Sequence, residues 1–234
     1  MKKSLLIIAL IVIIVGTINV FFGPEPLNKQ EAAKQLPWQI EITPEGNTRV
    51  LDIEIGKSTV AEVKQLWKVA PQIALFRSPE GVFKLESFLG KVKIGPFQAR
   101  VIFNLEASQA QLKQFAENST SLDATPSGSH QMRISEEDFE RALLMTIDEM
   151  SYSPAVDTEV DMLKNLFGEA EQTIQIDENS RYWLYPKRGL VILVNTEDKE
   201  VFHYFPLRNY QQILQHIEQI KQRKTELPVA EQTE

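Results

Sequence analysis

An uncharged, strongly apolar run over residues 5–22 constrains this 234-residue chain more than any other stretch. A helix rises about 1.5 Å per residue, so a helix of this length just crosses a hydrocarbon core of about 30 Å. Lys2 and Lys3 precede the run, and positive charge is retained on the cytoplasmic side of a membrane. The run therefore predicts a transmembrane anchor, residues 1–22, of a single-pass inner-membrane protein whose C-terminal domain lies in the periplasm.

A cleaved secretory signal peptide is the alternative interpretation of the run. The apolar core of a signal peptide usually has about 7–15 residues and is followed by an A-x-A cleavage site. The run here is longer and no such site closes it, although Gly16 or Asn19 would be tolerated at a cleavage position. We favour the anchor, whereas cleavage would release a secreted protein.

Composition narrows the classes of function. Hydrophobic residues make up 43% of the chain and charged residues 24%, so we expect an ordinary packed core. The chain has no cysteine, which excludes disulfides, thiolate catalysis and cysteine-ligated zinc. The formal net charge of −7 argues against nucleic acid as a partner, because phosphate binding needs a basic face.

Periodicity predicts an α+β fold: one N-terminal transmembrane helix, then two tandem units of helices packed on antiparallel β-meanders. A polar, proline-punctuated stretch indicates a linker after the anchor, and a stretch rich in Ser, Thr, Gly and Pro indicates the boundary between the units. The predicted organisation is a transmembrane anchor (1–22), a linker (23–37), a first α+β unit (38–118), a connecting loop (119–131), a second α+β unit (132–222) and a flexible tail (223–234).

Capping signals place the helices. Thr59 and Glu62 have capping-box spacing, and Ser135 precedes an apolar stripe that extends to Met150. Gly168 ends a helix at a position where a left-handed residue is favoured. The predicted helices cover residues 59–70, 109–117, 135–150, 157–168 and 210–220. The second unit is predicted to contain four strands, over residues 172–176, 181–185, 190–195 and 201–205.

The chain contains an internal repeat. A shift of 100 residues aligns identical residues at the first helix and at its counterpart in the second unit, namely Val60, Lys64, Leu66, Ala70 and Gln72 with Val160, Lys164, Leu166, Ala170 and Gln172. In both units a run of strands and a closing helix follow. The shared order of elements favours duplication of one structural unit.

Three short motifs resemble the small SmpA/BamE-like envelope proteins. Ile55-Gly-Lys-Ser-Thr-Val-Ala-Glu-Val63 is similar to their G-x-[ST]-x-x-x-V helix opening, and Leu166-Phe-Gly-Glu-Ala170 to their L-G-x-P helix end, with Ala170 in place of proline. Tyr182-Trp-Leu-Tyr185, followed by residues 189–194, resembles their W-x-Y strand and the next strand. A tandem pair of such units also resembles the β-lactamase-inhibitor-protein architecture. The resemblance implies a role in the cell envelope and assigns no binding residue.

No catalytic, metal or cofactor site is predicted. The three histidines, His130, His203 and His216, have no acidic or cysteine neighbour at metal-ligand spacing, and we interpret His203 as a packed histidine on a strand. Gly56-Lys-Ser58 lacks the upstream glycine of a phosphate-binding loop, and no G-x-S-x-G motif occurs. The acidic groups at 136–138 and 157–161 lie at helix starts, where carboxylates are favoured without a metal ion.

Aromatic residues give the one feature with a functional implication. The strands over 181–185 and 201–205 are apolar on both faces. A strand with one solvent-exposed face instead alternates apolar and polar residues. Either helices cover both faces, or one face is a docking surface for another protein. The candidate interaction surface consists of Tyr182, Trp183, Tyr185, Phe202 and Tyr204.

These observations together predict a non-enzymatic, membrane-anchored bacterial envelope protein with a protein-interaction or assembly role. Its expected partners are the inner membrane, through residues 5–22, and an envelope protein. The alternative is a periplasmic module that binds a small or peptidoglycan-like ligand in a groove between the two units. A hydrolase would need carboxylates, or a histidine and an acid, that converge only in the folded chain.

Overall fold

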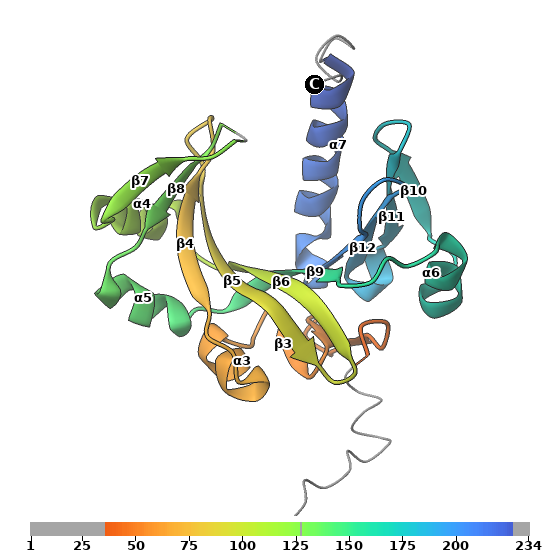
Figure 1. Cartoon of the computed structure of the whole chain (residues 1–234), viewed down its shortest axis with the longest axis horizontal. Helices are drawn as coiled ribbons and strands as arrows, with labels where there is room; N and C mark the ends of the chain where they lie inside the picture. Colours follow the sequence, from red (N-terminus) through yellow and green to blue (C-terminus); the bar gives the residue numbers. More distant parts are fainter. Residues whose placement is uncertain (1–35, 127, 227–234) are drawn as a thin grey trace, which may run out of the picture. The chain divides into compact units, whose positions relative to one another are not determined.

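The fold is built on one large antiparallel sheet (Figure 1). In a computed structural model, residues 36–126 and 128–226 are described. The ten strands are ordered β10-β11-β12-β13-β9-β6-β5-β4-β8-β7. Their bounds are β4 Gln72–Arg77, β5 Phe83–Ile94, β6 Phe97–Leu105, β7 Ser121–Ala124, β8 His130–Arg133, β9 Ile147–Pro154, β10 Gln172–Gln175, β11 Ser180–Tyr185, β12 Leu190–Asn195 and β13 Val201–Tyr204.

A small three-stranded sheet and five α-helices complete the described part of the chain. The small sheet contains β1 Glu41–Ile42, β2 Thr48–Val50 and β3 Ile53–Ile55. The helices are α3 Val60–Trp67, α4 Gln109–Glu117, α5 Glu136–Leu143, α6 Val160–Phe167 and α7 Tyr210–Glu226, with short 3₁₀ turns η1 Pro186–Arg188 and η2 Leu207–Asn209.

The predicted fold class was wrong in how the β structure is organised. We predicted two units with a meander each, but β9 pairs with β6 on one side and with β13 on the other. Both meanders therefore join into a single sheet, and the described part is mostly β. The segment responsible is Ile147–Pro154, whose first four residues fall within the predicted helix over 135–150 because Ile147 and Met150 also fit a helical stripe. Pairing along two neighbouring strands outweighs that weak helical pattern.

The predicted anchor, residues 5–22, lies outside the residues that the structure describes. Within the two described ranges, no helix combines the length and the apolar character that are needed to span a bilayer. This finding corrects the predicted transmembrane helix and the predicted single-pass inner-membrane localisation. We therefore do not propose that placement for the protein.

Helices cover the two faces of the large sheet unequally. Helices α3, α4, α5 and α6 pack on one face and enclose the larger core, through residues such as Val63, Phe115, Ala142 and Phe167. Helix α7 packs on the other face, which we call the α7 face (Figure 1). The core under α7 contains Ile174, Tyr182, Leu184, Val191, Phe205 and Ile217. It covers β10 to β13 and leaves the α7 face of β4, β5 and β6 outside either core.

The order of elements agrees with the internal repeat. Helix α3 is followed by β4, β5, β6 and then α4, and helix α6 is followed by β10 to β13 and then α7. The closing helices nevertheless pack on opposite faces, because Leu112 and Phe115 of α4 enter the larger core while Ile217 of α7 enters the smaller one. This difference leaves one face of the first half of the sheet without a helix.

Candidate binding surface on the α7 face

The five aromatic residues of the predicted interaction surface are buried in the structure. Trp183, Tyr185, Phe202 and Tyr204 belong to the larger core, and Tyr182 belongs to the core under α7. The Tyr185 hydroxyl donates to the Gly168 carbonyl at 2.9 Å, and the Tyr204 hydroxyl donates to the Pro37 carbonyl at 2.8 Å. The two-sided apolar pattern thus corresponds to helices on both faces, which was the other interpretation of the same pattern.

The uncovered part of the α7 face contains apolar and cationic side chains, together with the carboxyl group of Glu86 between Lys84 and Phe88. We call it the open face and define it by Phe76, Lys84, Phe88, Lys91, Arg100 and Ile102. Ile102 lies opposite Phe88 on the neighbouring strand, and Ser151 of β9 lies on its other side. Phe88 is 40% exposed, which is unusual for a phenylalanine in the middle of a sheet. The open face therefore has the mixed character of a binding surface.

A β-bulge places two cations against each other on the open face. The register between β5 and β6 shifts between Phe88 and Lys91, at Gly90, whose φ is +68°. The bulge turns Lys91 to the same side as Phe88, where it lies directly opposite Arg100. Both side chains are exposed, and neither forms an ion pair or hydrogen bond with another described residue. Like charges directly opposite each other destabilise a sheet, so this pair is a local cost to the fold.

Two hollows border the open face. One, of about 420 Å³, lies where β5, β6, β9 and β13 meet, and Arg100, Ser151, Ser153 and Lys199 are among its lining residues. The other, of about 520 Å³, lies between the sheet and α7. Phe76, Val82 and Lys84 line its sheet side, and His216, Gln219 and Arg223 line its helix side. The second hollow thus leaves space between α7 and the sheet that no described residue fills.

Ion pairs hold α7 above the sheet. Arg223 is 3.0 Å from Glu80, in the turn between β4 and β5, and Lys224 pairs with Asp177, in the turn between β10 and β11. The Lys224 ammonium and the Ser180 hydrogen bonds lower the pKa of Asp177 to about 2. The helix therefore contacts both halves of the sheet, and it frames the open face.

Titratable groups gather under α7 at the centre of the sheet. The Ser151 hydroxyl and His203 Nδ1 are 3.0 Å apart, and burial, together with His216 and Lys84, lowers the pKa of His203 to about 4. Burial also raises the pKa of the Glu86 and Glu149 carboxyls. Asn104 Nδ2 donates to Glu149 at 2.7 Å, while Asn104 Oδ1 is buried without a partner.

The serine–histidine pair lacks the surroundings of an acyl-transfer site. Ser151 lies on β9, between two antiparallel partners, so its neighbouring backbone N–H groups are used in the sheet rather than in an oxyanion hole. A histidine with a pKa near 4 is also a weak general base at neutral pH. We interpret the pair as a packed polar contact, in keeping with the assignment of His203 to a packed strand position.

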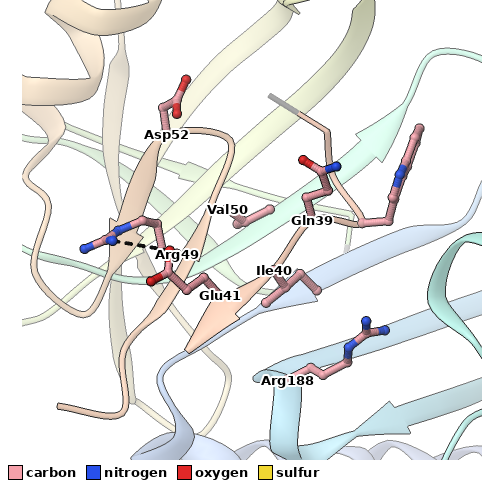
Figure 2. Close-up of a pocket in the computed structure, with 8 residues that line it drawn as sticks. Gln39, Ile40, Glu41, Arg49, Val50, Asp52 and Arg188 are labelled. Carbon is pink, nitrogen blue, oxygen red and sulfur yellow. Dashed lines mark hydrogen bonds and ion pairs between the residues drawn. The ribbon is translucent and has the colours of Figure 1, made fainter. Parts of the chain in front are cut away.

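A further hollow, of about 540 Å³, lies beside the small sheet (Figure 2). Most of its charged groups are engaged within the fold. Arg49 is 2.8 Å from Glu54 and 3.4 Å from Glu41, and Arg188 donates to the Phe167 carbonyl at 2.6 Å. The lining also contains the carboxylates of Glu41 and Asp52, so this hollow suits an anion less well than the open face does.

Comparison with protein-family models, with curated proteins and with solved structures finds no match to this chain. The resemblance to SmpA/BamE-like proteins stays a prediction, and no site residue is transferred from a relative. The open face was missed from the sequence. Its signal was the hairpin at Gly95-Pro96, whose register places Arg100 opposite Lys91 only once the bulge at Gly90 is recognised.

Neutralising either cation of the opposed pair is expected to stabilise the free protein. Lys91→Gln or Arg100→Gln removes the repulsion and should raise the free energy of unfolding by about 0.2–1 kcal/mol. The double variant should gain no more than either single variant, because one repulsion has been removed in each case. Lys93→Gln is the matched control, since Lys93 lies opposite Gln98. Urea unfolding measures all four variants, and a destabilised Lys91→Gln would contradict the assignment.

Proposed function

We propose that the protein is a non-enzymatic protein-interaction module whose open face binds an acidic, amphipathic helical segment of another protein. The observation that carries this proposal is the opposed, unpaired pair Lys91 and Arg100 on an otherwise acidic chain of net charge −7. Such a pair slightly opposes folding, and an anionic group between the two side chains would turn this repulsion into two attractive contacts.

The second half of the sheet supports a helix as the bound element. There α7 lies on the same face of the sheet and buries Ile217 against Val191 and Leu184. On the first half, Phe88 and Ile102 offer apolar contacts of the same kind, and the hollow of about 520 Å³ beside α7 leaves room. A helix that docks into a groove through apolar residues at helical spacing is a common mode of peptide recognition.

Charge would set the orientation and specificity of such a partner. Lys91 and Arg100 lie at one end of the open face, in the hollow that also contains Ser153 and Lys199, and Phe76 and Lys84 lie at the other end, toward α7. An acidic residue at one end of the bound helix would meet Lys91 and Arg100 there. Exposed charges of this kind mainly accelerate association and exclude wrong partners, so binding should weaken as the salt concentration rises.

The hollow of about 420 Å³ favours a second candidate function, the binding of a small anion at the junction of the two halves. Lys91 and Arg100 supply positive charge, and the Ser151 and Ser153 hydroxyls supply hydrogen bonds. A small anion would use these groups without contacting Phe88. The two candidates therefore differ in whether Phe88 lies at the interface.

Site-specific photo-crosslinking separates these candidates. A photoreactive phenylalanine analogue replaces Phe88 in the full chain, and the same analogue replaces Leu144, which follows α5 and is 72% exposed, as the control. We expect a discrete crosslinked protein from position 88 and none from position 144. Arg100→Glu should remove the crosslink, and reversal of an acidic residue in the crosslinked segment of the partner to lysine should restore it.

Three outcomes would overturn the proposal: no crosslink from position 88, a crosslink that is insensitive to Arg100→Glu, or a crosslink to a second copy of this chain. Absence of a crosslink together with saturable binding of inorganic phosphate that depends on Arg100 would select the second candidate. The variants are at exposed positions, so circular dichroism should show an unchanged fold.

A further inference from the structure

A fourth hollow lies beside α6. Its volume is about 710 Å³, within the range of about 300–1,000 Å³ that is typical of small-molecule sites. It lies where the β9–α6 connection passes the end of the β5–β6 hairpin. We call it the α6 groove and define it by Trp38, Lys93, Phe97, Tyr152, Val156 and Met162.

The wall of the α6 groove is apolar and incompletely covered. Val156 is 77% exposed and Met162 is 52% exposed, although both are large hydrophobic residues. Trp38 and Phe97 form an edge-to-face pair, with ring centroids 5.5 Å apart, on the other side. Burying these side chains against an apolar ligand would remove their surface from water, which is the main favourable contribution in sites of this type.

Tyr152 points to a ligand in the groove. The residue is only 1% exposed, and its hydroxyl forms no hydrogen bond with any described residue, unlike the buried Tyr185 and Tyr204. Two side-chain polar atoms of the described residues are sealed from solvent without a partner, Ser87 Oγ and Asn104 Oδ1. The Tyr152 hydroxyl is not among them, so it keeps a small contact with solvent, and the residue lines the groove. A buried hydroxyl normally has a partner, and here the ligand would supply it.

Two properties of the groove define the polar part of the ligand. Burial raises the pKa of Tyr152 to about 12, so the hydroxyl stays protonated at neutral pH and can donate to an oxygen. At the rim, Lys93 is exposed and forms no ion pair with a described residue, whereas Asp157 is 3.6 Å from Lys199. The uncompensated charge at the groove is therefore positive.

We propose that the α6 groove binds a small anionic amphiphile, such as a medium-chain carboxylic acid. Its apolar body lies against Trp38, Phe97 and Met162, one of its oxygens accepts a hydrogen bond from the Tyr152 hydroxyl, and Lys93 selects an anionic head over a neutral or cationic one. This site uses no residue of the open face. Loss of binding at one site therefore leaves binding at the other unchanged.

Isothermal titration of the full chain with decanoate below its micellar concentration tests the proposal. We expect saturable binding with one site, weaker binding of decanol and no binding of decyltrimethylammonium. Tyr152→Phe should weaken decanoate binding about fivefold, as expected for one lost hydrogen bond. Lys93→Gln should make decanoate and decanol bind alike, and Val156→Asp should abolish binding without affecting the fold, because Val156 is exposed.

Two control variants show whether a loss of decanoate binding is specific to the α6 groove. Leu144→Asp introduces the same charge at an exposed position just after α5 and should leave decanoate binding unchanged, and Lys91→Gln should do so as well. Absence of saturable binding would overturn the proposal, including the case in which another segment of the chain fills the groove. Equal affinity of Tyr152→Phe and the native protein for decanoate would also overturn it.

Discussion

Gly189→Ala is expected to lower the free energy of unfolding by about 3 kcal/mol or more, the sum of a positive-φ penalty and of steric overlap. Gly189 has a φ of +56°, and a Cβ atom there would lie 2.1 Å from Thr48 Oγ1 and 2.3 Å from the Phe205 carbonyl oxygen. One of these two atoms belongs to the backbone, which cannot move aside as a side chain can. The Thr48 hydroxyl donates to the Phe205 carbonyl at 2.6 Å, and the added Cβ would also break this hydrogen bond. Urea unfolding of the full chain, followed by tryptophan fluorescence, measures the loss.

Gly81→Ala provides the matched control for Gly189→Ala. Gly81 also has a positive φ, +85°, but the nearest atom to an added Cβ would be the Arg77 guanidinium at 3.9 Å. Gly81→Ala should lower the free energy of unfolding by only about 1 kcal/mol, the cost of the backbone conformation alone. Equal losses for the two variants would contradict the close approach of the small sheet to β12 and β13.

Acidification from about pH 6.5 to pH 4 is expected to remove about 3 kcal/mol of stability that depends on His203. The pKa of His203 is lowered to about 4 in the folded protein, from the ordinary histidine value of 6.5. Between these two pH values the unfolded chain binds a proton that the folded chain excludes, so stability falls as the pH falls. The measurement is the difference in unfolding free energy between the native protein and His203→Gln at each pH.

The comparison with His203→Gln is needed because other groups titrate in the same range. Burial raises the pKa of the Glu86 and Glu149 carboxyls, so these groups add stability as the pH falls and oppose the effect of His203. The lowered pKa of His216 acts in the same direction as that of His203, and Asp177 loses its stabilising charge only at more acidic pH. If the native protein and His203→Gln lose stability in parallel, the assignment of the acid effect to His203 is wrong.

Capping motifs and periodicity in the sequence predicted individual helices and strands, but not how the strands pair into one sheet. The capping box at Thr59 forms as expected, since its hydroxyl accepts from the Glu62 amide at 3.3 Å and the Glu62 carboxylate accepts from the Thr59 amide at 2.9 Å. Residues 147–154 satisfy helical and strand periods alike, and their pairing with β6 and β13 depends on residues more than 40 positions away. Sequence periodicity carries no information about such distant partners.

The candidate sites depend even more on distant contacts. The apolar pattern around Trp183 was recognised, but whether it is exposed depends on which faces α6 and α7 cover. The opposed cations arise from one bulge at Gly90, and the Tyr152 hydroxyl has no hydrogen bond because no polar group of another described residue reaches it. Neither feature has a motif, since each is defined by register and packing rather than by residue order.

The most direct test of the open face as a recognition surface is a charge-swap binding measurement. The acidic segment crosslinked from position 88 is synthesised, and its dissociation constant is measured with the native full chain and with Arg100→Glu. We predict at least about tenfold weaker binding to Arg100→Glu, and recovery when the facing acidic residue of the segment is changed to lysine. Equal affinity of the original segment for the native protein and for Arg100→Glu would contradict this account of the open face.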